Sequence, residues 1–209
     1  MSIDKQDRLK AEVISSSTDP QASCTHQPEL PPCLLVIFGA SGDLTFRKLF
    51  PALFSLFAGN RLPKDFAIVG ISRTKYTDES FRDRMRKSVE NNRGFNSDLW
   101  QKLAAKLHYL QVSYDNAQDF RELSRDLQVL DRKHGTEGNK LFYLAVPPKM
   151  YEPIASNLGL AGLAQGHEND HTAQGWSRIV VEKPFGHDLN SATNLDRTLH
   201  ENFAEDQIF

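Results

Sequence analysis

Short, wholly apolar segments alternate with longer segments of helical character along most of this 209-residue chain. Four of them are residues 34–38 (LLVIF), 66–71 (FAIVGI), 141–146 (LFYLAV) and 179–181 (IVV). Continuous apolar runs of this length are typical of strands in a parallel sheet, because helices cover both faces of such a sheet. The alternation therefore predicts an α/β fold, a Rossmann-like doubly wound parallel sheet with helices on both faces.

Helix-start signals lie between the second and third of these segments. Thr77 is a favourable N-cap residue for a helix that runs to about residue 91. Ser97 or Asp98 can cap the next helix, which we expect to extend through Leu107 before a short strand at residues 109–112. The basic residues after Thr77 alternate with acids and are interpreted as a solvent-exposed helix face: Arg82, Arg84, Arg86 and Lys87.

Later helices are indicated by apolar spacing and by stop signals. Four apolar residues from 120 to 130 recur at helical spacing, and Gly135 can end that helix. Another helix is expected over residues 150–158. Asp188 can cap a final helix whose apolar face begins with Leu189. Each strand is thus expected to be followed by at least one helix.

The polar start of the chain differs from the rest. Residues 1–31 are rich in Ser, Thr, Gln and Pro, so we expect a disordered tail followed by one domain over residues 32–209. A net charge of −2 argues against nucleic acid as a partner, and no apolar run approaches the roughly 18 residues that span a membrane. Cys24 and Cys33 make no disulfide framework, which favours reduced thiols in a cytoplasmic protein over a redox switch.

A glycine turn follows the first apolar segment: Gly39-Ala40-Ser41-Gly42-Asp43-Leu44. Gly39 permits a tight turn, and Gly42 lets the backbone approach a pyrophosphate closely. The start of the following helix offers free backbone N–H groups and the positive end of its dipole. The G-x-x-G spacing is shorter than the common G-x-G-x-x-G, and the lysine of a P-loop is missing. The turn indicates a dinucleotide site, the alternative being an ordinary strand-to-helix turn.

The end of the second apolar segment bears on which dinucleotide could bind. Enzymes that use NAD usually place an acid there, to accept hydrogen bonds from the ribose hydroxyls. This chain has Arg73 instead, between Ser72 and Thr74. A guanidinium can bind a 2′-phosphate with two hydrogen bonds, and either hydroxyl could add another. The sequence therefore predicts NADP as the cofactor, unless Arg73 is only a solvated surface residue.

The segment Glu182-Lys183-Pro184-Phe185-Gly186 directly follows the last apolar segment. Ligands of doubly wound sheets bind beyond the carboxyl ends of the strands. Lys183 is therefore expected where a nicotinamide and a substrate would meet, as a compact cation able to bind a phosphate or a sugar oxygen. Pro184 would fix the bend, and the peptide before it could be cis. A surface lysine at a turn is the alternative.

Together these motifs resemble those of the glucose-6-phosphate dehydrogenase family. The resemblance rests on the glycine turn with Lys48 and Pro51 after it, on residues 141–148 (LFYLAVPP) and on residues 182–186 (EKPFG). Residues 205–209 (EDQIF) are similar too. The motifs follow the family's order, near its spacings, from about residue 33 to the last residue.

The resemblance implies NADP-dependent oxidation of glucose 6-phosphate at C1 to 6-phosphogluconolactone, the first oxidative step of the pentose phosphate pathway, by a homo-oligomer. It assigns the pyrophosphate to the glycine turn, and assigns further cofactor contacts to Lys48, Arg73, Ser113, Tyr114 and Tyr151. Lys183 matches the family's lysine that touches both substrate and cofactor, and is the expected catalytic and substrate-binding residue.

The resemblance also predicts that the chain is the amino-terminal part of a longer enzyme, without the family's carboxyl-terminal α+β domain. The family's Arg-Ile-Asp-His-Tyr-Leu-Gly-Lys segment and its general-base histidine are expected after Phe209, where Ile208 and Phe209 resemble the start of a strand. Oxidising a sugar hydroxyl requires a base to take the proton. We therefore expect the isolated chain to bind NADP weakly and to be inactive.

Three other functions compete with this one. A stand-alone NADP-binding sensor domain stays open. A short-chain reductase would need Tyr-x-x-x-Lys, and no tyrosine here has a lysine four residues later. His167 and His171 match the H-E-x-x-H motif of zinc proteases, but they lie between Gly166 and Gly175 without apolar periodicity. We interpret them as loop residues and expect no metal.

Overall fold

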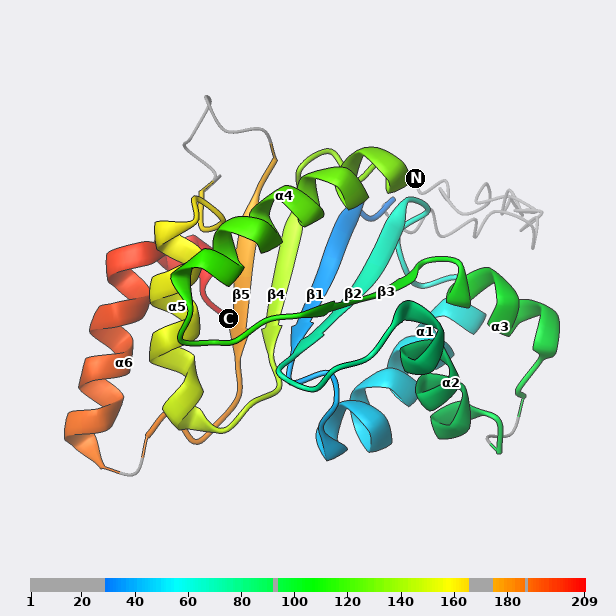
Figure 1. The fold of residues 1–209 in the computed structure, drawn as a ribbon, viewed down its shortest axis with the longest axis horizontal. Coiled ribbons are helices and arrows are strands. Elements are labelled where there is room, and N and C mark those ends of the chain that lie inside the picture. Colours follow the sequence, from blue (N-terminus) through cyan, green and yellow to red (C-terminus); the bar gives the residue numbers. More distant parts are fainter. Residues whose placement is uncertain (1–28, 92–93, 166–174, 187) are drawn as a thin grey trace, which may run out of the picture.

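The apolar segments form one sheet of five parallel strands in the computed structural model, which describes residues 29–91, 94–165, 175–186 and 188–209. The strand order is β3-β2-β1-β4-β5 (Figure 1). The strands are β1 (Cys33–Phe38), β2 (Phe66–Ser72), β3 (Leu107–Gln111), β4 (Lys140–Leu144) and β5 (Ser177–Val181). This order reverses direction between β1 and β4, which confirms the Rossmann-like fold.

Helices cover both faces of the sheet (Figure 1). One layer consists of α1 (Phe50–Ala58), α2 (Asp78–Val89) and α3 (Ser97–Ala104). The other consists of α4 (Ala117–His134), α5 (Tyr151–Leu160) and α6 (Leu189–Asn202). Short helical turns precede α1 (Thr45–Leu49) and α5 (Pro148–Met150), and a third follows α6 (Glu205–Gln207).

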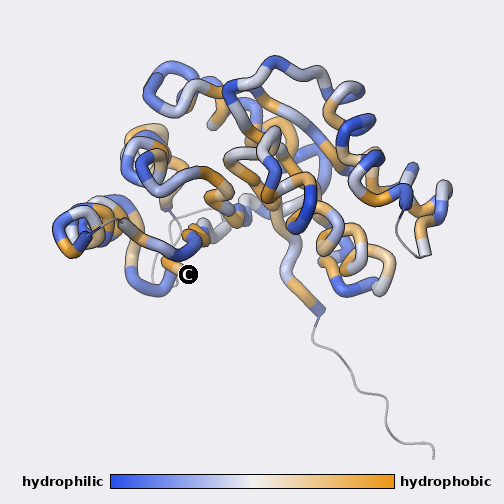
Figure 2. Tube along the Cα trace, turned by 90° about the horizontal axis from the view of Figure 1, so that it is seen from below, coloured by the Kyte–Doolittle hydropathy of each residue, from blue (hydrophilic) through white to orange (hydrophobic). Residues whose placement is uncertain are grey.

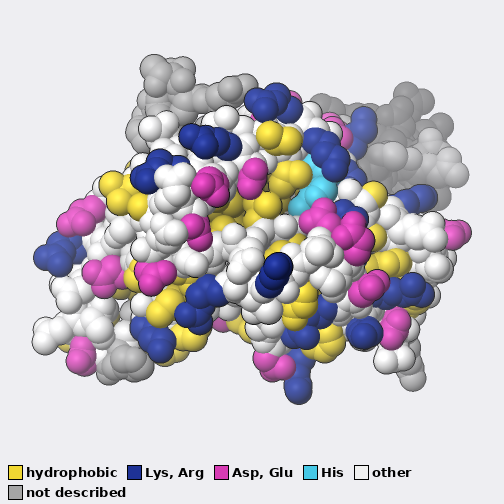
Figure 3. Space-filling model, in the orientation of Figure 1, with side chains coloured by type: hydrophobic (Ala, Val, Ile, Leu, Met, Phe, Trp, Pro, Cys, Tyr) yellow, Lys and Arg dark blue, Asp and Glu magenta, His cyan; other side chains and the backbone are white. Residues whose placement is uncertain are grey.

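The core consists of two apolar clusters, one on each face of the sheet. Side chains of β1 alternate between them: Val36 and Phe38 pack towards α4 and α5, whereas Ile37 packs towards α1 and α2. Hydrophobic segments accordingly lie in the interior in Figure 2, while the face shown in Figure 3 has interspersed basic and acidic side chains. Burial of the sheet on both sides explains why its strands are continuously apolar.

Most of the expected helix ends are confirmed. The Thr77 side chain accepts a hydrogen bond from the Ser80 backbone N–H, and Asp188 likewise caps α6 through Ser191. Gly135 ends α4 with a left-handed φ of 64°. These signals are local in sequence, and the helices begin and end as the signals predict.

The expected boundaries of α3 were wrong. Asn96 is its N-cap, accepting hydrogen bonds from the backbone N–H groups of Asp98 and Leu99 at 2.8 and 3.0 Å. The helix ends at Ala104, and Leu107 is already the first residue of β3. Leu107 pairs with Ile68 of β2 and is fully buried, so sheet pairing overrides its helical preference.

Leu189 does not belong to the apolar face of α6, as its side chain is 81% exposed. It precedes Leu195 by six residues, which places it about 120° around the helix at 3.6 residues per turn. Leu195 and Leu199 supply the buried contacts. Ile208, where the sequence predicts the start of a strand, forms a single isolated parallel bridge with Ile179 of β5.

Candidate nucleotide-binding site

A cavity of about 260 Å³ lies at the carboxyl ends of the strands, the lower edge of the sheet in Figure 1. Residues after β1, β2 and β4 line it, so it occupies the place where the strand order reverses. Its lining is Gly39, Ser41, Gly42, Ser72, Arg73, Thr74, Tyr114, Ala145, Val146, Pro147, Lys149 and Met150. A larger cavity, near Phe57 and Lys106, lies at the opposite edge, where ligands of such sheets do not bind.

Gly39 is required by the shape of this site. Its φ of +84° lies in the left-handed region, and a Cβ atom there would approach the Ala145 carbonyl oxygen to 2.1 Å. Gly70, which sequence reasoning missed, plays a related part, since a Cβ atom would lie 2.4 Å from the Phe81 ring and 2.9 Å from the Ala40 Cβ. These two glycines allow the turn to pass tightly between β4 and α2.

The backbone N–H groups of the turn divide into two sets. Those of Gly39 and Ala40 donate to the Ile71 carbonyl oxygen at 2.8 and 3.0 Å, and that of Gly42 donates to the Gly39 carbonyl oxygen at 2.8 Å. Those of Ser41, Asp43 and Leu44 donate to no other residue that the structure describes. Half of the N–H groups of the turn therefore stabilise the turn itself, and the free ones lie at the start of the helix, where the sequence predicts them. The remaining groups, at the start of a helix, suit an anion.

Tyr114 supports the glycine turn through its hydroxyl, which accepts a hydrogen bond from the Gly39 backbone N–H at 3.0 Å and donates to the Ile71 carbonyl oxygen at 3.4 Å. Burial raises the pKa of Tyr114 to about 12, so the hydroxyl keeps its proton at neutral pH. The Arg73 guanidinium lies 5.7 Å from the centre of the Tyr114 ring, an approach that favours a cation. Tyr114 therefore holds Arg73 and the glycine turn on the same side of the sheet.

The loop after β2 carries the hydroxyls expected beside Arg73. The Thr74 hydroxyl donates to the Ser41 hydroxyl at 3.1 Å, which joins this loop to the glycine turn. The Ser72 hydroxyl lies 2.6 Å from the Tyr109 hydroxyl, which also donates to the Thr74 carbonyl oxygen. Arg73 itself is exposed and lines the cavity. The loop thus presents the Arg73 guanidinium and the Thr74 hydroxyl beside the turn, whereas the Ser72 hydroxyl is buried against Tyr109.

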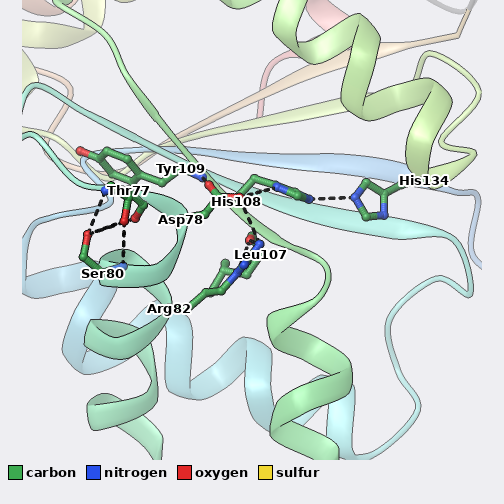
Figure 4. A network of polar contacts seen from close by, with 8 residues as sticks. All are labelled: Thr77, Asp78, Ser80, Arg82, Leu107, His108, Tyr109 and His134. Atoms are coloured by element: carbon green, nitrogen blue, oxygen red, sulfur yellow. Dashed lines mark hydrogen bonds and ion pairs between the residues drawn. The ribbon is translucent and has the colours of Figure 1, made fainter.

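Asp78 anchors this loop to the edge strand (Figure 4). Its carboxylate accepts hydrogen bonds from the Tyr109 backbone N–H at 2.8 Å and from Arg82 at 3.1 Å, and lies 3.0 Å from His108 Nδ1. On the other side of the ring, His108 Nε2 lies 2.9 Å from His134 Nε2. The network joins the start of α2 to β3 and to the end of α4.

We expect the histidine pair to make the fold less stable in acid. Burial, followed by the neighbouring charges, lowers the pKa of His134 to about 4, and burial also lowers the pKa of His108. Unfolded histidines take up protons near pH 6.5, so the unfolded chain binds more protons between pH 6.5 and 4. The free energy of unfolding should therefore fall across that window by about 1–2 kcal/mol, allowing for solvent screening.

Urea unfolding at pH 7, 5 and 4 measures this effect in the wild type and in His134→Gln. The variant should lose part of the decrease, because the substituted amide cannot titrate while His108 still can. His200→Gln is the control, since His200 is exposed and its hydrogen bond to Glu205 raises rather than lowers its pKa. An identical pH dependence in His134→Gln and the wild type would contradict the assignment.

The segment after β5 is held by two tyrosines. The Tyr143 hydroxyl donates to the Glu182 carboxylate, and the Tyr151 hydroxyl donates to the Glu182 carbonyl oxygen at 3.3 Å. Burial, with the Glu182 charge adding to it, raises the pKa of Tyr143. The peptide between Lys183 and Pro184 is cis, as the sequence allowed, and the Lys183 side chain is exposed. Lys183 therefore projects from an anchored loop at the carboxyl edge of the sheet.

The structure gathers only some of the expected site residues around the cavity. Gly39, Ser41, Gly42, Arg73 and Tyr114 line it. Among the described residues, those expected at the site but outside this lining are Ala40, Asp43, Leu44, Lys48, Ser113, Tyr151 and Lys183. The motif after β4 supplies lining that sequence reasoning did not assign to the cofactor: Ala145, Val146, Pro147, Lys149 and Met150.

The residues outside the lining have structural surroundings of their own. Ala40 is fully buried beneath the turn, and Asp43 forms an ion pair with Arg47 at 2.6 Å. Lys48 is exposed on the helical turn before α1. The Ser113 backbone N–H donates to Asp119 at 2.8 Å. Tyr151, 2% exposed, reaches the Lys183 segment rather than the cavity.

The basic residues of α2 do not all face solvent, contrary to their interpretation from the sequence. Arg82 donates to the Leu107 carbonyl oxygen at 2.8 Å as well as to Asp78. Arg84 donates to the Ser41 carbonyl oxygen at 3.0 Å. Arg86 and Lys87 are exposed, as expected. Two of these four basic side chains are drawn inwards because neighbouring elements offer them carbonyl oxygens.

Metal-ligating and membrane-spanning features are missing from the described part of the chain. No group of three or more His, Cys, Asp or Glu side chains there could hold a metal ion. The histidines of the H-E-x-x-H match, His167 and His171, lie outside the described residues. No described helix is long and apolar enough to cross a membrane. Cys33 is a free thiol whose pKa burial raises to about 11.

The strand order, the glycine turn and the cavity at the reversal point define a dinucleotide-binding domain of the Rossmann type. The sequence model described as "Glucose-6-phosphate dehydrogenase, NAD binding domain" matches residues 36–209. The chain belongs to the glucose-6-phosphate dehydrogenase family, which confirms the resemblance seen in its motifs.

Similar proteins carry the same name. The chain is 42% identical over 177 residues to a glucose-6-phosphate 1-dehydrogenase of Aggregatibacter actinomycetemcomitans, covering 85% of this chain and 35% of that protein. It is 40% identical over 185 residues to that of Chlamydia muridarum, covering 87% and 36%. A solved glucose-6-phosphate dehydrogenase in complex with its substrate glucose-6-phosphate matches with a TM-score of 0.72 and 33% identity, covering 86% and 36%. The chain thus spans about a third of the length of these relatives.

Proposed function

We propose that this chain holds NADP for the oxidation of glucose 6-phosphate at C1 to 6-phosphogluconolactone. The observation that carries the proposal is a single cavity lined by a glycine turn and by Arg73, at the reversal point of a Rossmann-type sheet. The free N–H groups of Ser41, Asp43 and Leu44 suit a pyrophosphate. NADP, when bound, supplies an acceptor for the hydride that leaves the sugar carbon.

Different residues of this chain would bind the nucleotide and the substrate. Arg73, with the Thr74 and Ser41 hydroxyls, would bind the 2′-phosphate, because a guanidinium and hydroxyl donors match its oxygens. Tyr114 would hold the glycine turn and Arg73 in fixed positions relative to each other. Lys183 would bind a substrate oxygen beside the cofactor, on the loop that Tyr151 anchors. The nucleotide is therefore held by the glycine turn and the β2 loop, and the substrate by the β5 loop.

The resemblance completes the proposal. It assigns the base that takes the sugar hydroxyl proton to a histidine beyond the motifs of this chain, within a cytoplasmic homo-oligomer. Lys48 and Ser113 remain proposed cofactor contacts that would require NADP to extend past the cavity. Turnover by the 209-residue chain alone is accordingly not expected.

Titration of the purified chain with NADP and NAD by calorimetry tests the proposal. NADP should bind at least about tenfold more tightly than NAD, because only NADP offers the 2′-phosphate to Arg73. Absorbance at the NADPH band should stay flat when glucose 6-phosphate and NADP are added to the chain. Equal affinity for the two cofactors, or no binding of either, would show that this cavity is not an NADP site.

A further inference from the structure

Arg84 belongs to α2, but its guanidinium lies against the glycine turn. Nη2 donates to the Ser41 carbonyl oxygen at 3.0 Å, and Cζ lies 4.9 Å from the centre of the Phe46 ring. Phe81, one helical turn earlier, packs against Gly70 so closely that a Cβ atom there would not fit. The side of α2 that carries Arg84 is therefore pressed onto the turn.

The charge of Arg84 has no acidic partner among the residues that the structure describes. Arg82 and Arg86 of the same helix form ion pairs with Asp78 and Glu90. The Arg84 guanidinium instead donates a hydrogen bond to the Ser41 carbonyl oxygen. Its Nε is buried and lacks a hydrogen-bond partner among those residues. A partly buried cation with an unused donor is costly unless an anion compensates for it.

The Arg84 guanidinium lies next to the candidate phosphate site. Arg84 binds the carbonyl oxygen of Ser41. The hydroxyl of Ser41 accepts a hydrogen bond from the hydroxyl of Thr74, the residue after Arg73. Ser41, Arg73 and Thr74 all line the same cavity. Arg84 is therefore linked to the lining of this cavity through the Ser41 peptide.

We propose that Arg84 is a positioning residue for the 2′-phosphate. It fixes Ser41 in the orientation that pairs with Thr74, and it adds a second positive charge next to the turn. The inference rests on the proposed NADP site and deepens it, because it assigns part of the preference for a phosphorylated ribose to α2. It predicts an effect on ligands that carry a 2′-phosphate and little effect on those that lack it.

The test compares 2′,5′-ADP with 5′-AMP as calorimetric probes of the full 209-residue chain. Arg84→Met should weaken 2′,5′-ADP binding about tenfold and 5′-AMP binding less than about twofold. Arg84→Lys keeps the charge but not the planar guanidinium, so it should restore part of the lost affinity. Arg86→Met is the matched control, because it removes the same charge from an exposed position of the same helix, and it should change neither affinity.

The outcomes separate this inference from the function on which it rests. A wild-type chain that binds neither probe overturns the NADP site, and the role of Arg84 with it. A wild-type chain that prefers 2′,5′-ADP, with Arg84→Met equal to Arg86→Met, overturns only the role of Arg84. An equal loss of affinity for both probes in Arg84→Met also overturns the role of Arg84, because a merely structural contact would weaken the binding of both probes alike. Melting temperatures measured in parallel show whether each variant is folded.

Discussion

Gly39→Ala should both destabilise the fold and abolish nucleotide binding. The new Cβ atom would lie 2.1 Å from the Ala145 carbonyl oxygen, 2.8 Å from the Ala145 carbonyl carbon and 2.9 Å from a Val146 methyl group. Backbone atoms at the end of a central strand cannot move aside cheaply, and alanine also disfavours a φ of +84°. We expect the free energy of unfolding to fall by about 3 kcal/mol or more. Urea denaturation measures this loss.

Gly135→Ala is the matched control for that substitution. Gly135 also has a positive φ, +64°, but a Cβ atom there would have no neighbour within 4 Å. The control therefore carries the backbone strain without the collision, and should cost about 1–2 kcal/mol. It should also leave NADP affinity unchanged, since it ends α4 away from the cavity. Equal losses for the two variants would mean that the turn is not tightly packed against β4.

The glycine turn was predictable because its signal is local. A continuous apolar strand, a glycine and the start of a helix occupy adjacent positions, and their order fixes the geometry. Arg73 was predictable for the same reason, since it directly follows the second strand. The caps Thr77 and Asp188 and the stop at Gly135 also depend only on nearby residues. Such features need no knowledge of which strands are neighbours.

The remaining parts of the site depend on contacts between distant segments. Tyr114 reaches Gly39 across 75 positions, and Arg84 reaches Ser41 across 43. The resemblance assigned Tyr114 to the cofactor site, but neither side chain carries a local mark that reveals its contact with the turn or distinguishes it from an ordinary core tyrosine or a surface arginine. Leu107 was misplaced in a helix for the same reason, because its strand is defined by pairing with Ile68. Spacing along one element cannot reveal such partners.

Arg73→Glu should reverse the cofactor preference. The substitution replaces the one guanidinium in the cavity lining with a carboxylate, which repels a 2′-phosphate and can accept hydrogen bonds from unphosphorylated ribose. We expect NADP affinity to fall about 100-fold, corresponding to about 3 kcal/mol. NAD affinity should stay the same or increase. Calorimetric titration with both cofactors measures the ratio of the two dissociation constants.

The free energy of unfolding should change little in Arg73→Glu, because Arg73 is exposed. Its guanidinium lies 5.7 Å from the centre of the Tyr114 ring. Arg121→Glu on α4 is the control, as it makes the same charge change at an exposed position outside the cavity. If Arg121→Glu shifts the ratio as far as Arg73→Glu does, the effect is one of net charge. If neither shifts it, Arg73 does not bind the 2′-phosphate, and the preference for NADP must come from other residues at the turn.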